Sequence, residues 1–483
     1  MENNKIVTNR ELSLGEALVP VVVLMALLAF NIFFKDGAWL GDYSNHFILL
    51  MSGALAAVVG FYNKTSFDTM VQEVWSNLKS VFVPIMILLL VGALAGTWLI
   101  SGIIPAMVYY GLKVLSPEIF LPASVVIAAM VSIATGSSWT TSATVGVALI
   151  GIGGAMDISL GMVAGAVISG AYFGDKMSPL SDTTNLAPAM AGTDLFTHIR
   201  YMAFTTVPSI LIALAIFALL SPDVQETDTT AVTSLLVDIE KIFDVTPMLF
   251  LVPAAVVALI IFKVKPLAAL GSGVVLAIVF AFIYQPDILA GLSESSTQSV
   301  INAVLTDTAI ATDNEKLADL FQAGGMNGML WTIYLIISAM VFGGIMDGIG
   351  ALQRITASLL QLADSVFGLF ASTVFSCLGL NAIASDQYLA IVIPGKMFAK
   401  AYEERGLAPE NLSRTLEDSG TVTSVLVPWN TCGAYQSGVL GVSVLDYFVY
   451  AIFNYLSPFM TLLFAALRIK IRQLNGEFLS KEA

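Results

Sequence analysis

Long uncharged apolar runs alternate along the chain with short polar segments. Several runs reach about 18 to 20 residues, the length that an α-helix needs to cross the hydrocarbon core of a bilayer, about 30 Å thick. We therefore predict ten membrane-spanning segments, the last of them less regular, at residues 15–34, 45–62, 81–100, 159–175, 200–220, 246–263, 266–284, 329–346, 447–468 and 420–440. The pattern predicts an all-α polytopic membrane protein.

Two further apolar regions are interrupted by polar residues. The polar segment Thr135–Thr141 interrupts residues 119–150, while Asn381 and the run Ser385-Asp386-Gln387 interrupt residues 366–400. Non-helical backbone at membrane depth is tolerated only where protein or water covers it. We therefore predict that each region is a re-entrant hairpin with its tip inside the membrane.

The second half of the chain resembles the first. The segment Thr183–Pro188 matches Thr423–Pro428 at an offset of 240 residues, and at an offset of 246 the two hairpin tips coincide. Short matches between apolar segments also arise by chance, but the order of elements agrees as well. We predict two repeats, each with about five spans, a hairpin and a broken helix. The expected boundaries are 1–14 for an N-terminal tail, 15–220 for the first repeat (hairpin about 119–150, broken helix about 159–195), 221–245 for an acidic linker, 246–468 for the second repeat (hairpin about 366–400, broken helix about 415–440) and 469–483 for a C-terminal tail.

The distribution of charge tests this duplication. An odd number of crossings per repeat forces the two halves into opposite orientations. With the N-terminus inside, 16 of the 21 Lys and Arg residues fall on the cytoplasmic side. Residues 221–245 and 285–328 are expected to be long loops on the outside, and each carries six acidic residues against one lysine. We therefore expect inverted-topology repeats with both termini cytoplasmic, an arrangement typical of secondary transporters with broken helices.

Composition supports lipid as the solvent. The 483 residues are 57% hydrophobic and 12% charged, whereas charged residues make up about 25% of soluble domains. The formal net charge of -14 would argue against nucleic acid if it were evenly spread, but its distribution along the chain is more informative than its sum. We expect no nucleic-acid partner. The two cysteines and two histidines lack metal-ligand spacing, and no phosphate-binding loop is present. The sequence thus predicts no cofactor, no ATP-driven step and no enzyme.

Ionisable residues flank a helix breaker in the first half. Asp175, Lys176 and Asp182 surround Pro179, which must interrupt a helix that begins near residue 159. The carbonyls freed by a broken helix, together with Ser, Thr and Asp oxygens, form a suitable shell for a hard cation. We predict one wall of a sodium site here, in which at least one of Asp175 and Asp182 binds the ion or a proton. Lys176 is either the charge partner that keeps Asp175 ionised or a proton-linked competitor of the cation. Further candidate ligands on this wall are Ser178, Thr183, Thr184 and Asn185.

The first hairpin tip is expected to form the opposite wall, through Gly136, Ser137, Ser138 and Thr140. In the second half, Asp386 is the third candidate for sodium and proton coupling. Ser and Thr are also common in membrane helices, where they bond their own backbone. Asp418 is equally suited to capping a helix, and Glu417 is expected at the membrane interface. The remaining candidate ligands in this half are Ser385, Asp418, Thr421, Thr423 and Asn430.

The string S-G-A-Y-F-G-D-K-M-S-P-L-S-D-T-T-N-L-A at residues 169–187 resembles the signature of the NhaC family of sodium/proton antiporters. Asp418-Ser419-Gly420 and Pro428–Gly433 resemble the same family, and the resemblance extends over essentially the whole chain. It implies membership of the broader ion-transporter superfamily, with a scaffold, a moving transport domain and two hairpins that point at the substrate. It also implies a homodimer formed through the scaffold.

The expected function is secondary active exchange of sodium for protons across a bacterial inner membrane, with an elevator-like movement of the transport domain. The NhaC resemblance leaves an alternative open, because that family also includes exchangers that couple sodium and protons to malate and lactate, or to amino acids. Trp139, Trp429 and Asn430 would line the pocket of such an exchanger. A remote alternative is an intramembrane hydrolase that uses Asp175 with Asp182 or Asp386.

Overall fold

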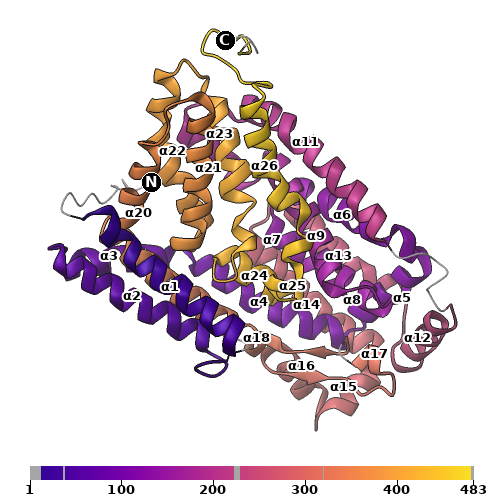
Figure 1. The fold of residues 1–483 in the computed structure, drawn as a ribbon. Coiled ribbons are helices and arrows are strands. Elements are labelled where there is room, and N and C mark those ends of the chain that lie inside the picture. The colour runs from indigo at the N-terminus through magenta and orange to yellow at the C-terminus, as the bar shows by residue number, and fades with distance from the viewer. Residues whose placement is uncertain (1–11, 36–37, 222–228, 319, 480–483) are drawn as a thin grey trace.

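The structure is a computed structural model that describes residues 12–35, 38–221, 229–318 and 320–479 (Figure 1). Most of the expected N-terminal tail, part of the linker and the end of the C-terminal tail lie outside the described residues. The described part is predominantly helical, and its one sheet pairs β1 (Thr308–Ala309) antiparallel with β2 (Gln322–Ala323). Figure 1 shows α1 to α3 on the left, α20 to α23 at the upper left, and α5, α8 and α12 on the right.

The helices of the first half are α1 (Leu14–Lys35), α2 (Ser44–Tyr62), α3 (Phe67–Ser80), α4 (Phe82–Ile100), α5 (Ile103–Val114), α6 (Pro117–Thr135), α7 (Ser138–Thr141), the π-helical turn η1 (Ser142–Gly146), α8 (Val147–Ala155), α9 (Leu160–Met177), α10 (Asp182–Ala191) and α11 (Leu195–Leu220). The segment that follows contains α12 (Thr229–Ile242), η3 (Pro247–Phe250), α13 (Leu251–Ile261), α14 (Pro266–Tyr284), α15 (Pro286–Leu292), α16 (Ser296–Leu305), α17 (Glu315–Ala318) and α18 (Gly325–Gly328). The chain ends with α19 (Leu330–Gly348), α20 (Ala351–Leu360), α21 (Val366–Ile383), α22 (Gln387–Glu404), α23 (Pro409–Leu416), the π-helical turn η4 (Glu417–Thr421), η5 (Ser424–Leu426), α24 (Thr431–Leu440), α25 (Val444–Tyr447), η6 (Phe448–Tyr450) and α26 (Ile452–Ala466).

Eight helical segments of the described chain are long and apolar enough to cross a membrane, or up to ten if each bent pair counts as one span. This confirms a multi-pass membrane protein. The spans predicted at 45–62, 81–100 and 266–284 agree closely with α2, α4 and α14. Helix α19 packs between α2 and α3, and α4 packs on α14, so these spans bury apolar faces against one another.

Three expectations about elements were wrong. Residues 420–440 do not form one span, because a π-helical turn, a short 3-10 turn and α24 follow one another there. The acidic linker contains α12, which buries Leu235 and Ile239, and residues 285–328 also contain short helices. Helix α3 was not predicted, because its polar residues lower the hydropathy of this amphipathic helix, which directly precedes α4.

Both interrupted apolar regions turn back on themselves where the sequence predicted a tip. Gly136 has φ +70° between α6 and α7, and Ser385 has φ +59° between α21 and α22. Helices α21 and α22 pack against each other after this turn. Since α6 and α21 are each long and apolar enough to span a bilayer, the re-entrant character of the two regions stays a prediction.

Helix boundaries recur at a nearly constant offset between the halves. Helix α4 (82–100) has a counterpart in α19 (330–348) 248 residues later. The starts of α6, α9 and α11 at 117, 160 and 195 recur at 366, 409 and 444, an offset of 249 (409 minus 160), and α10 (182–191) recurs as α24 (431–440). The offsets of 240 and 246 were therefore wrong. The residues matched by sequence lie in different secondary structure: Thr183 lies in the first turn of α10, whereas Thr423 precedes η5.

Candidate functional site

The tip of the first hairpin lies directly on the break between α9 and α10. At Gly136 a Cβ atom would meet the Leu180 Cβ at 2.6 Å and the Ser181 amide nitrogen at 3.0 Å, and its φ of +70° also favours glycine. The break itself spans Ser178 to Ser181, around the proline that the sequence analysis identified. The two walls of the expected ion site are thus in contact.

Asp175 is buried at this contact. Its Oδ2 atom accepts hydrogen bonds from the Ser138 amide at 3.1 Å and from the Ser138 hydroxyl at 2.6 Å. The Ser181 side chain lies close to the same carboxyl group. Within the described ranges no Lys or Arg forms an ion pair with Asp175. A buried carboxylate held only by neutral donors leaves a negative charge for a cation or a proton to neutralise.

Lys176 has a different partner from the expected one. Its ammonium forms a fully buried ion pair with Asp418, from the second half of the chain. Asp418 also accepts hydrogen bonds from Thr205, at 2.8 Å, and from Thr461. Consecutive residues on a helix point about 100° apart, so Asp175 and Lys176 face different neighbours. Assigning Lys176 to Asp175 was therefore wrong, and Asp418 is not a helix cap but lies buried within the π-helical turn η4.

Glu417 is also buried, although the sequence analysis placed it at the interface. It lies in the π-helical turn η4, and its Oε1 accepts a hydrogen bond from the Thr183 hydroxyl at 3.0 Å. Its Oε2 has no hydrogen-bond partner in the part of the chain that the structure describes. Short π-helical segments occur frequently at functional sites. Glu417 therefore adds a second acidic side chain to the surroundings of Asp175.

Other candidates on the first wall hold the break together. The Thr184 hydroxyl donates to the carbonyls of Asp175 and Lys176, both at 3.1 Å. The Asn185 amide donates to the carbonyls of Pro179 at 2.9 Å and Ser181 at 2.7 Å. Freed carbonyls that were expected to bind a cation are thus already bonded to side chains.

Two more first-half candidates, Ser178 and Ser137, also bond the backbone. Ser178 donates to the carbonyl of Ile133 at 2.8 Å, and Ser137 caps α7 by accepting from the Thr140 amide at 3.2 Å. Asp182, by contrast, is exposed at the first turn of α10. It lies within electrostatic range of Asp175. Because Asp182 is exposed, it is better placed at the entrance to the site than at its centre.

The second hairpin meets the second break in the same manner. The Thr431 amide donates to the carbonyl of Ser385 at 3.0 Å, and Asp386 caps α22 by accepting from the Leu389 amide at 3.0 Å. The Asn381 amide donates to the Gly420 carbonyl at 2.7 Å and to Thr423 at 3.0 Å. The hairpin tip and the broken helix are thus bonded together, as in the first half.

The remaining second-half candidates divide into two kinds. Asn430 donates to the Asn381 carbonyl at 2.9 Å and caps α24, so its amide is occupied. The hydroxyls of Ser385 and Thr421 are buried and have no partner among the described residues. In the same part of the chain, no group of three or more His, Cys, Asp or Glu residues is arranged to hold a metal ion.

The two halves are joined at the site by Trp139, which was expected to line a substrate pocket, and by Tyr435, which was not predicted. The Trp139 ring stacks on Tyr435 with centroids 3.9 Å apart, and the Tyr435 hydroxyl donates to the Trp139 carbonyl at 3.1 Å. Thr205 and Thr461 were missed because isolated threonines in apolar helices carry no distinguishing pattern. Glu417 was visible beside Asp418 but was misinterpreted as an interfacial charge.

Comparison with known proteins places this site in a family. The model of the Na+/H+ antiporter family matches residues 170–469, which include the last part of α9, both breaks and the second hairpin. The Na+/H+ antiporter NhaC of Alkalihalophilus pseudofirmus is 36% identical over 96% of this chain and 97% of its own length. NhaC of Bacillus subtilis is 35% identical, over 86% of this chain and 91% of its own length. The malate-2H+/Na+-lactate antiporter of Bacillus subtilis is 33% identical, over 95% of this chain and 94% of its own length. The chain belongs to the NhaC family of Na+/H+ antiporters.

Proposed function

We propose that this protein is a secondary active transporter that exchanges sodium for protons across the bacterial inner membrane. The observation that carries the proposal is the buried Asp175 carboxylate, held by Ser138 of the hairpin tip where the tip meets a broken helix. Broken helices near the bilayer midplane are where secondary transporters bind their coupling ions. Two relatives that are named Na+/H+ antiporter NhaC match 96% and 86% of this chain and support this function.

Exchange follows from competition at one carboxylate. Asp175 must be ionised to bind sodium and protonated to return without it, so the two ions exclude each other. Ser138 and Ser181 supply neutral oxygens beside the carboxyl group. The exposed Asp182 attracts cations toward the site, and Asp386 is the third candidate, at the N-terminus of α22.

The proposed architecture is a pair of inverted-topology repeats in which the transport domain moves in an elevator-like manner. The constant offset of helix boundaries supports the repeats, and the Lys and Arg asymmetry supports opposite orientations with both termini cytoplasmic. The scaffold, its movement and a homodimer are carried over from the family resemblance.

The test measures proton movement in proteoliposomes that hold a preformed pH gradient, after addition of sodium, lithium, potassium or choline chloride. Sodium should collapse the gradient, and choline should not. Asp175→Asn should reduce the response to that of empty liposomes, since it removes the charge and keeps an oxygen for Ser138. Asp194→Asn is the matched control, because Asp194 is an exposed helix cap and Asn also caps helices well. Full exchange in the Asn variants of Asp175, Asp182 and Asp386 would show that none of them is the coupling group.

Exchange of a small organic acid or an amino acid is the second candidate, supported by the malate/lactate relative. An organic carboxylate would need free amides at helix N-termini. Here the N-terminus of α7 is bonded to Asp175, and that of α22 is capped by Asp386, itself a carboxylate. This arrangement favours a cation. Gradient collapse by malate, lactate or an amino acid, with no response to sodium alone, would reverse the preference.

A further inference from the structure

Several buried polar atoms in the first-hairpin segment, in α9 and in α24 have no hydrogen-bond partner among the described residues. They are Trp139 Nε1, the hydroxyls of Ser142 and Tyr172, and both amide atoms of Gln436, when partners are sought throughout the described residues. Ser142, Tyr172 and Gln436 are completely buried. An unsatisfied buried polar group is unfavourable, and proteins usually satisfy such groups with ordered water. We call Trp139, Ser142, Tyr172 and Gln436 the polar column.

Ser142 and Gln436 of the polar column lie on two segments that pack against each other, η1 and α24. The first-hairpin segment contacts α24 at Trp139, which stacks on Tyr435, and again at Gly146, where a Cβ atom would meet Leu440 at 3.0 Å. The two segments therefore run side by side in the same direction, and Ser142 and Gln436 each lie between the two contacts along their own segment.

The inner end of the column reaches Asp175. Tyr172 lies one helical turn before Asp175 on α9, so both side chains lie on one face of the helix. The Cys432 thiol, one turn before Gln436 on α24, lies next to the Tyr172 hydroxyl and the Trp139 indole. Polar atoms thus continue from Gln436 and Ser142, past Tyr172 and Trp139, to the carboxyl group that Ser138 holds.

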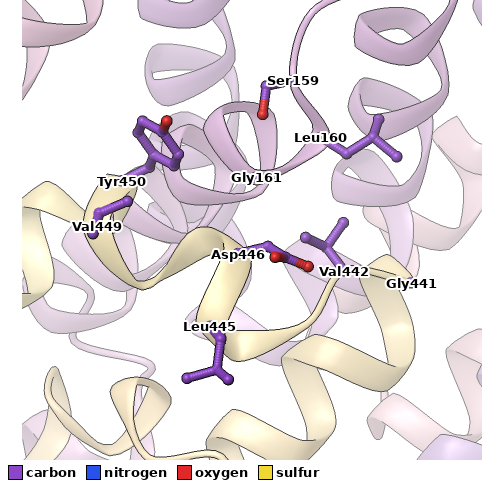
Figure 2. Close-up of a pocket in the computed structure, with 9 residues that line it drawn as sticks. All are labelled: Ser159, Leu160, Gly161, Gly441, Val442, Leu445, Asp446, Val449 and Tyr450. Atoms are coloured by element: carbon purple, nitrogen blue, oxygen red, sulfur yellow. The ribbon is translucent and has the colours of Figure 1, made fainter. Parts of the chain in front are cut away.

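The outer end of the column approaches a surface pocket. The pocket has a volume of about 530 Å³ and is lined by Ser159 and Gly161 at the start of α9, by Gly441 at the end of α24, and by Asp446 and Tyr450 (Figure 2). Leu440 and Val167, both buried, come together at Gly146 between the pocket and Gln436. One apolar layer therefore separates the column from the pocket in this conformation.

We propose that the polar column holds a file of water molecules through which protons reach Asp175 from the end of the molecule that carries this pocket. The inference rests on the proposed sodium/proton exchange and adds a route for the proton. Water bonded to the Tyr172 hydroxyl and the Gln436 amide can pass a proton along hydrogen bonds. The apolar layer at Leu440 keeps hydrated sodium out of the file.

The first experiment detects the water directly. Full-length protein in lipid nanodiscs is exposed to short X-ray pulses, which generate hydroxyl radicals from bound water, and side-chain oxidation is measured by mass spectrometry. Tyr172 and Cys432 should be oxidised quickly despite their burial. Tyr402 and Cys377 are the matched comparators, since they are equally buried but lie outside the column. The double variant Ser142→Ala with Gln436→Met should reduce oxidation of Tyr172 and Cys432 several-fold. Oxidation of all four residues at the same slow rate in the wild-type protein would show a dry column and overturn the inference.

The second experiment tests the proton route. Tyr172→Phe and Gln436→Met should each slow sodium-driven proton movement about tenfold, a change of about 1.4 kcal/mol in the barrier, while binding of radioactive sodium is retained. Ser52→Ala is the control, because Ser52 is a buried serine on α2 whose hydroxyl also lacks a partner among the described residues. Unchanged proton movement in both column variants would overturn the route. If the column is hydrated but the wild-type protein moves no protons in response to sodium, the proposed function is wrong. The role of the water file is then wrong as well.

Discussion

Two adjacent residues of α9 show how differently a membrane protein treats buried charge. Asp175 is held by neutral donors, whereas Lys176 is neutralised by Asp418. Removing one partner of a buried ion pair leaves an uncompensated charge, which is costlier than replacing both partners. The Lys176–Asp418 pair therefore joins the first broken helix to the second, whereas Asp175 has no ion-pair partner among the described residues.

Lys176→Met should consequently destabilise the protein by about 3 to 5 kcal/mol, because Asp418 would keep its charge without a cation. The double variant Lys176→Met with Asp418→Asn should recover most of that loss, since Asn still accepts from Thr205 and Thr461. The measurement is the unfolding midpoint in detergent. Lys400→Met is the control, because the Lys400–Glu404 pair is exposed and should contribute less than about 1 kcal/mol. Equal stability of both single Lys variants would show that the buried pair is energetically unimportant.

At the scale of elements, each hairpin turns through one left-handed residue, but the two residues differ. Gly136 packs against Leu180 so closely that a Cβ atom has no room. Ser385 adopts a similar φ of +59° with a side chain whose hydroxyl has no partner among the described residues. Left-handed backbone costs a non-glycine residue about 1 to 2 kcal/mol.

Gly136→Ala should therefore lower stability by more than that strain alone and also separate Ser138 from Asp175, with loss of sodium-dependent proton movement. Ser385→Gly should be neutral or stabilising by up to about 1 kcal/mol, because glycine relieves the strain. Unfolding midpoints and proteoliposome transport, measured on both variants, check the pair. A tolerated Gly136→Ala with unchanged transport would contradict the close packing of tip and break.

Much at this scale was predictable from the sequence. Proline and acidic residues located the first break, and a polar cluster with glycine located the first tip, because few residue types tolerate those backbones. The partners were not predictable: Lys176 and Asp418 lie 242 residues apart, and either Asp175 or Asp418 would have satisfied a lysine. Short sequence matches also gave the wrong offset between the repeats. The equivalent backbone positions are the helix ends and the left-handed residues, and short sequence matches do not identify these positions.

At the scale of the whole molecule, the 249-residue offset makes an inverted topology testable at two equivalent helix caps. Asp194 caps α11 and accepts from the Thr197 amide, and Ser443 caps α25 and accepts from the Leu445 amide. Both caps are exposed. If the repeats are inverted, these two positions lie on opposite sides of the membrane.

A membrane-impermeant maleimide should therefore label Ser443→Cys in intact cells and Asp194→Cys only after permeabilisation. Each change should cost about 1 kcal/mol because it removes a cap, so both variants should fold. The native Cys377 and Cys432 are buried and should give little background. The unsubstituted protein measures that background on both sides, and sodium/proton exchange by each variant confirms that it is folded. Labelling of both positions from the same side would contradict the inverted topology, because two equivalent caps on one side require parallel repeats. The elevator-like movement would then lose its basis, since it relies on two oppositely oriented hairpins reaching the ion from the two sides.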